Sequence, residues 1–153
     1  MNFNIRKMDT ADRSVWMEMR DNLWPNEPPL AHLHSIEDIL AGDDAWGFLA
    51  ESAEGTPAAF AELSIRKYAN GCDSQPVPFL EGIFVRPEFR RQGVGAGLIR
   101  YIEAFVMARG FNELGSDALI DNHQSHAAHA GWGFSEMERI VCFRKLLNHS
   151  TAD

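Results

Sequence analysis

The residues best suited to chemistry lie between Arg90 and Gly97, where two arginines precede a turn that contains three glycines. An amphipathic helix follows the turn, with apolar residues at Leu98, Ile102 and Phe105. A helix N-terminus presents unpaired backbone N–H groups and the positive end of the helix dipole. Glycine lets a ligand approach that backbone closely. The segment therefore predicts an anion site, most naturally for phosphate.

Two common phosphate motifs do not fit this segment. A P-loop needs Gly-Lys followed by Ser or Thr, and the segment contains no lysine. A dinucleotide fingerprint has the spacing GxGxxG after the first strand, whereas Gly93-Val94-Gly95-Ala96-Gly97 follows the fourth predicted strand. The anion site is therefore of another kind.

The charges are distributed unevenly along the 153 residues, which carry a formal net charge of −8. This balance disfavours nucleic acid as a partner, because phosphate binding needs a basic face. The stretch between Arg20 and Arg66 holds many acids but no Lys or Arg, whereas Arg86, Arg90 and Arg91 lie close together. The contrast predicts one cationic and one anionic ligand. A solvated acidic surface that aids solubility is the alternative.

Hydrophobic periodicity alternates between strand and helix along the chain. Strands are predicted over residues 3–8, 46–51, 58–66, 79–85, 113–118 and 134–145. Helices are predicted from Thr10 until the prolines near residue 25, from a Ser35 cap through Leu40, around residues 98–110, and over 123–130. We therefore predict one mixed α/β domain over residues 1–147, with a tail at 148–153.

The composition also bears on location and on metals. No apolar run approaches the roughly 20 residues that span a bilayer, and Met1 to Lys7 lacks the start of a signal peptide. Two cysteines, Cys72 and Cys142, favour packing roles over a disulfide scaffold. The histidines at 123, 126 and 129 spread around a helix rather than sharing one face. We expect a cytoplasmic protein without a metal and without a membrane partner.

The run Arg90-Arg91-Gln92-Gly93-Val94-Gly95 resembles the (Q/R)xxGx(G/A) pyrophosphate loop of the GNAT family of acyl-CoA N-acetyltransferases. The order of elements and the segment Gly131-Trp132-Gly133-Phe134 are also similar to that family. The resemblance implies an α/β fold with a mixed, mostly antiparallel central sheet flanked by helices. It also implies acetyl-CoA as co-substrate, with the backbone of the fourth strand paired to pantetheine like an added strand.

Longer blocks resemble the aminoglycoside 6'-N-acetyltransferases within that family, among them Leu23-Trp24-Pro25, 68–74, 79–85, Ser116-Asp117 and Glu138-Arg139. The resemblance implies a homodimer and two sets of contact residues. The implied aminoglycoside site consists of Trp24, Tyr68, Glu81, Asp117 and Glu138. The implied acetyl-CoA site consists of Ile83, Phe84, Val85, Arg91, Gln92, Gly93, Val94, Gly95, Ala96 and Asn122.

These residue types suit the implied reaction. A polycationic substrate needs several carboxylates, and Glu81, Asp117 and Glu138 lie on or beside three separate predicted strands. Glu81 is the predicted general base, and backbone N–H groups near Ile83 or Val85 are predicted to stabilise the oxyanion. His129 stands four residues before Gly133, where many family members have a tyrosine that protonates the leaving thiolate.

Plainer interpretations stand beside these. The three carboxylates could form ordinary surface pairs, Trp24 could be a core residue at a helix end, and His129 could only pack. Two other functions also remain open at this level. One is acetylation of another amine, such as a polyamine or a protein N-terminus, and the other is a non-catalytic acyl-CoA sensor.

Overall fold

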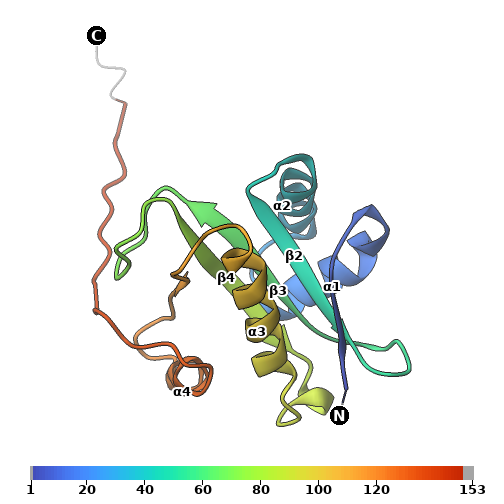
Figure 1. Cartoon of the computed structure of the whole chain (residues 1–153). Coiled ribbons are helices and arrows are strands. Elements are labelled where there is room, and N and C mark those ends of the chain that lie inside the picture. Colours follow the sequence, from blue (N-terminus) through green and yellow to red (C-terminus); the bar gives the residue numbers. More distant parts are fainter. Residues whose placement is uncertain (1, 150–153) are drawn as a thin grey trace.

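The computed structural model describes residues 2–149 and is built around one five-stranded sheet with the strand order β1-β2-β3-β4-β5 (Figure 1). The strands are β1 Asn4–Lys7, β2 Ala45–Glu51, β3 Pro57–Arg66, β4 Val77–Val85 and β5 Gly115–Ser116. The helices are α1 Arg13–Leu23, α2 Pro29–Ala41, α3 Val94–Met107 and α4 His123–Gly131. Neighbouring strands are antiparallel except β4 and β5, which are parallel. The predicted mixed, mostly antiparallel sheet is confirmed.

Helices cover both faces of the sheet, and alternation along β2 explains why (Figure 1). Phe48 and Ala50 belong to the core that contains α3, whereas Leu49 belongs to the core that contains α1 and α2. Successive side chains of a strand point to opposite faces, so an apolar strand between two helical layers is buried on both sides. The continuous apolar run of β2 fits this central position.

The second helix begins earlier than its predicted Ser35 cap. Pro29 occupies the first turn of α2, and Ser35 lies inside the helix. Proline breaks a helix only in its interior, because the first turn needs no backbone N–H from it. Pro29 therefore begins α2 and does not break it.

The third helix runs from Val94 to Met107, and the predicted end at Gly110 belongs to the turn that follows it. Gly110 has a φ of +89°, and the N–H of Phe111 donates to the carbonyl of Val106 at 3.1 Å. The fifth strand is also shorter than predicted, with two residues in place of 113–118. These differences shift boundaries and keep the order of the elements.

The predicted final strand over 134–145 is wrong for the described chain. Residues 135–149 form no strand and run away from the body of the molecule (Figure 1). Apolar residues of the predicted strand are exposed, among them Met137, Ile140, Val141 and Phe143. A short apolar run such as residues 140–143 is typical of a strand, but a strand also needs a hydrogen-bonding neighbour. The predicted tail at 148–153 lies largely outside the described residues.

Within residues 2–149, no helix combines the length and the hydropathy that crossing a bilayer requires.

Candidate active site

Strands β4 and β5 separate next to Glu81. They pair only through Phe79 with Gly115 and through Leu80 with Ser116. On the other edge, Glu62 pairs with Gly82 and Leu63 with Leu80, so Glu81 is the extra residue of a β-bulge. A bulge bends its strand and redirects side chains, and this one coincides with the separation.

Beyond the separation, one edge of β4 has no strand beside it among the described residues. Ile83, Phe84 and Val85 lie on this stretch and are half-buried. Unpaired backbone N–H and C=O groups on a strand edge can hydrogen-bond an extended ligand. The geometry therefore suits the predicted pairing with pantetheine.

The loop before α3 has the backbone that the glycine pattern predicts. Arg91 has a φ of +64° and Gly93, the N-cap of α3, has a φ of +82° without any side-chain cap. The first helical bond is donated by Gly97 to the carbonyl of Gly93 at 2.9 Å, so the N–H groups of residues 94–96 precede the helical ladder. The side chain of Val94 is buried, so Val94 can offer a ligand only its backbone.

Gly95 has a packing role as well. A Cβ there would lie 3.1 Å from Cζ2 of Trp132, the residue that ends α4. The C-terminal end of α4 therefore packs beside the first turn of α3. At the other end of α4, the Oδ1 of Asn122 accepts from the N–H of Ser125 at 3.1 Å and caps the helix. The amide nitrogen of Asn122 takes no part in this cap.

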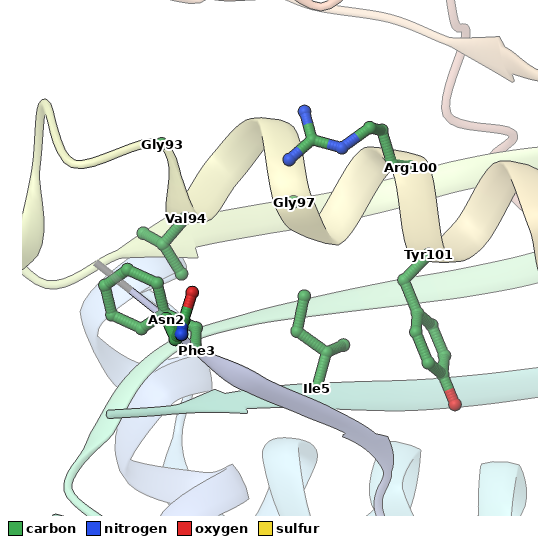
Figure 2. Close-up of a pocket in the computed structure, with 8 residues that line it drawn as sticks. All are labelled: Asn2, Phe3, Ile5, Gly93, Val94, Gly97, Arg100 and Tyr101. Atoms are coloured by element: carbon green, nitrogen blue, oxygen red, sulfur yellow. The ribbon is translucent and has the colours of Figure 1, made fainter. Parts of the chain in front are cut away.

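A cavity of about 470 Å³ lies on the other flank of α3, toward β1 (Figure 2). Figure 2 shows Phe3 and Val94 at one end of it and Ile5 and Tyr101 farther along α3. It shares only Gly93 and Val94 with the predicted acetyl-CoA residues. This groove therefore meets the glycine loop from the side opposite Trp132.

Glu81 is held by Arg66 and Ser64. Arg66 donates from Nη2 to Oε1 at 2.7 Å and from Nε to Oε2 at 2.8 Å, and the Ser64 hydroxyl donates to Oε2 at 2.5 Å. Partial burial works to raise the pKa of Glu81, but the bonds from Arg66 and Ser64 outweigh it and leave the pKa below its usual value. A carboxylate has about four acceptor positions, so one position on Oε1 remains for a further donor.

Trp24 and Glu81 line a cavity of about 330 Å³ on the α1–α2 side of the sheet. The indole packs directly on β4, because a Cβ at Gly82 would come within 2.6 Å of Cζ2 of Trp24. The guanidinium of Arg20 lies 4.7 Å from the centroid of the Trp24 ring. Trp24 thus contacts the core and also faces the cavity. The other lining residues are Arg20, Glu27, Ser35, Asp38, Ile39 and Glu62.

The remaining predicted substrate residues lie at different places. Asp117 is exposed directly after β5, and its charge adds to the larger effect of the Glu81 hydrogen bonds in raising the pKa of Arg66. Tyr68 is 67% exposed on the loop between β3 and β4. Glu138 lies on the exposed C-terminal segment, next to Met137, whose Cβ is 3.2 Å from the Cβ position of Gly71. Trp24 and Glu81 therefore line one cavity, and Asp117 is near enough to Arg66, the partner of Glu81, to raise the pKa of that arginine. Tyr68 and Glu138 do not line this cavity.

His129 lies at the point where β4 and β5 separate. Its Nε2 is 2.7 Å from the Oγ of Ser116, the last residue of β5, and its Nδ1 is 2.7 Å from the carbonyl oxygen of Ser125. The ring also packs against Trp132 and Phe134. His129 therefore lies where a proton donor to the thiolate is predicted, and it also packs in the way that the plainer interpretation expects.

A buried ion pair that the sequence pattern did not reveal lies beneath the cavity. Arg20 donates to both carboxylate oxygens of Glu62 at 2.5 Å, and the indole N–H of Trp16 donates to Oε2 at 2.8 Å. Arg20 also donates to Nδ1 of buried His32 at 3.2 Å. A signal was present, because Arg20 lies four residues after Trp16 on the apolar face of α1, and a charge there requires a buried partner.

Cys72 and Cys142 are free thiols. Across residues 2–149, no three His, Cys, Asp or Glu side chains gather where they could hold a metal ion.

A mixed sheet whose fourth and fifth strands separate beside a glycine-opened helix is the architecture of an acyl-CoA-dependent acyltransferase. The model of the acetyltransferase (GNAT) family matches residues 13–134. The chain belongs to the GNAT family of acetyltransferases, whose co-substrate is acetyl-CoA.

Several relatives share nearly the full length. The chain is 43% identical over 143 residues to an aminoglycoside N(6')-acetyltransferase type 1 of Salmonella typhimurium, covering 93% of this chain and 98% of that protein. It is similar to the structure of AAC(6')-Iy in complex with a bisubstrate analogue, CoA-S-monomethyl-acetylneamine (TM-score 0.90, 41% identity, 96% of this chain and 100% of that one). It is also similar to AAC(6')-Ih from Acinetobacter baumannii (TM-score 0.89, 37% identity, 96% and 100%).

Proposed function

We propose that this protein transfers the acetyl group of acetyl-CoA to the 6'-amine of aminoglycosides and thereby confers resistance to them. The observation that carries the proposal is the cavity in which Trp24 and Glu81 lie beside the separation of β4 and β5. An indole can pack on a sugar ring or an ammonium group, and carboxylates attract a polycation. The full-length similarity to aminoglycoside 6'-N-acetyltransferases supports the same conclusion.

In the proposed reaction the amine nitrogen attacks the thioester carbon, forming a C–N bond while the C–S bond breaks. The amine loses one proton, and the CoA thiolate gains one. Glu81 takes the proton of the amine, directly or through water, at the remaining acceptor position on Oε1. Backbone N–H groups near Ile83 or Val85 stabilise the oxyanion. The proton for the thiolate comes from His129 or from a group hydrogen-bonded to it.

We propose that acetyl-CoA binds along the unpaired edge of β4 with its pyrophosphate on the loop before α3. Three features support this: the free edge at Ile83, Phe84 and Val85, the positive φ angles of Arg91 and Gly93, and the N–H groups of residues 94–96, which precede the helical ladder of α3. The backbone of residues 91–96 would bind the phosphates, and the amide nitrogen of Asn122 would contact the cofactor from α4. Residues 1–147 would act as one catalytic domain in the cytoplasm, where acetyl-CoA is available.

We also propose a homodimer in which the segment 135–147 packs against a second copy. The segment is extended and exposes large apolar side chains, including Val141 at 75% and Phe143 at 91%. Exposed apolar patches of this kind mark contact surfaces, and an unpaired sheet edge accepts a further strand. Glu138 lies in this segment, so its predicted contact with the substrate depends on where the segment docks.

The dimer can be tested by sedimentation. Phe143→Asp should shift the protein toward monomer, whereas Met107→Asp, at a 60% exposed apolar residue of α3, should not. A wild-type protein that is monomeric at micromolar concentration would refute the dimer.

Mass spectrometry of amines incubated with protein and acetyl-CoA tests the function itself. Acetylation of kanamycin or tobramycin, lost when the 6'-amine is blocked, is the expected result. Acetylation only of other amines would leave the family assignment intact and refute the substrate. Acetyl-CoA binding without turnover of any amine would indicate a sensor.

A further inference from the structure

His129 is engaged by the protein at both ring nitrogens. A carbonyl oxygen can only accept, so the 2.7 Å contact with the Ser125 carbonyl places a hydrogen on Nδ1. In the neutral ring Nε2 then has no hydrogen and accepts from the Ser116 hydroxyl at 2.7 Å. The rings of Trp132 and Phe134 lie at centroid distances of 5.4 and 5.2 Å. His129 therefore has no ring nitrogen left for direct contact with a leaving group in this arrangement.

Ser116 occupies the position that His129 does not reach. It is the last residue of β5, it pairs with Leu80, and the two strands separate immediately afterwards. Its side chain is half-buried, and its Oγ lies 2.7 Å from His129 and 3.5 Å from the carbonyl oxygen of Leu80. A hydroxyl can donate one hydrogen bond while it accepts another, so Ser116 can link the imidazole to a group in the opening.

We infer that Ser116 donates the proton to the departing CoA thiolate and that His129 supplies it from behind. The inference rests on the proposed function and changes its acid from His129 to a serine–histidine pair. Ser116 is then the catalytic residue, because its hydroxyl touches the sulfur, and His129 acts through it.

The proton balance agrees with the observed hydrogen bonds. As the C–S bond breaks, its electron pair stays on sulfur, which takes the Ser116 hydroxyl proton. The proton on Nε2 of the imidazolium moves to Oγ at the same time. The product state has a neutral His129 with Ser116 donating to Nε2, and this pattern fits the two distances. Water returns one proton to the pair after CoA leaves.

A purely structural role for Ser116 makes a different prediction. The Ser116–His129 bond joins β5 to α4, so its loss could simply loosen that contact. Loosening would reduce stability or raise KM, and it would not depend on the basicity of the leaving group. A proton donor would lower kcat and would matter less when the leaving group needs no proton.

The test compares wild type, Ser116→Ala and Ser116→Thr with acetyl-CoA and with its selenoester analogue across pH. Positioned proton transfer typically contributes about 10²–10⁴-fold; because a thiolate leaves readily, we expect Ser116→Ala to lower kcat by about tenfold to a hundredfold. KM should change little, and threonine should restore the rate. The deficit should shrink with the selenoester, because a selenolate is far less basic than a thiolate.

An equal deficit for both esters, or a wild-type kcat in Ser116→Ala, would overturn the inference while leaving the acetyltransferase activity standing. Lack of aminoglycoside turnover by wild type would instead refute the proposed function. The hydrogen-bond pattern can be tested without activity by ¹⁵N NMR of the imidazole. A neutral His129 with its hydrogen on Nε2 would overturn the relay, and a change in the Nε2 signal in Ser116→Ala would support it.

Discussion

Gly93 offers a clean test of the anion loop, because its substitution separates backbone strain from ligand binding. Its φ is +82°, and a Cβ built there meets no atom within 4 Å. An alanine would therefore cost only the conformational penalty of the left-handed region, about 1–2 kcal/mol. For a domain of this size each kcal/mol lowers Tm by about 2–4 °C, so the variant should remain folded.

The same methyl group would stand in the open space where the pyrophosphate is proposed to meet the backbone. We expect Gly93→Ala to weaken acetyl-CoA binding at least about tenfold, which corresponds to about 1.4 kcal/mol. Titration calorimetry measures the affinity, and a thermal melt confirms that the protein is folded.

Gly110→Ala is the matched control. Gly110 has a φ of +89° and also meets no atom within 4 Å, but it lies beyond the opposite end of α3. Both variants should lose similar stability, and only Gly93→Ala should lose affinity. Equal affinities in the two variants would refute the loop as the phosphate site. Gly95 is less suitable, because a side chain there also meets Trp132.

Three further outcomes are expected. Partial burial works to raise the pKa of Glu81, but the hydrogen bonds from Arg66 hold it below its usual value. The pair therefore stabilises the fold at pH values above the unfolded pKa of about 4.3. This contribution is lost as the pH falls through the lower pKa of the folded state. Arg66→Gln should therefore lose stability in urea titrations at neutral pH and approach wild type in acid. Glu81→Gln should lower kcat as well as raise KM, whereas Asp117→Asn and Glu138→Gln should raise only the aminoglycoside KM. The rise should be up to about fivefold, since exposed pairs contribute roughly 0.2–1 kcal/mol, and Asp21→Asn should match wild type. Paromomycin, with a 6'-hydroxyl, should be a poor substrate beside kanamycin; equal rates would refute the 6' assignment.

Local features of the site were predictable from sequence. The loop before α3 depends on residues within one turn of the helix, and its positive φ angles fall where an N-cap glycine and its neighbours require them. The pairs that determine the electrostatics are not local. Arg20 and Glu62 lie 42 positions apart in the sequence. Arg66 at the end of β3 binds Glu81 on the adjacent strand β4, so periodicity alone could not connect either pair.

The strand predicted over 134–145 is wrong for a related reason, because it too depends on a partner that is distant in sequence. The continuous apolar run at 140–143 shows only that the segment is apolar. Whether a strand forms depends on the edge that it meets, and within the described residues this segment pairs with no strand of the sheet. The sequence pattern predicted that the segment is apolar, but only pairing with another strand in three dimensions decides whether it forms a strand.

The pairing of carboxylates in the cavity that Trp24 and Glu81 line determines which of them can attract a polycation. Glu62 is neutralised by Arg20, and Glu81 by Arg66, so two of its four carboxylates contribute little net attraction. The other two are Asp38 on α2 and Glu27, which lies 3.9 Å from Arg20. Long-range attraction would then come from the exposed acids around the opening, and the paired carboxylates would fix the position of the bound amine. In this arrangement, capture depends on salt concentration, whereas positioning depends on the two arginine-held carboxylates.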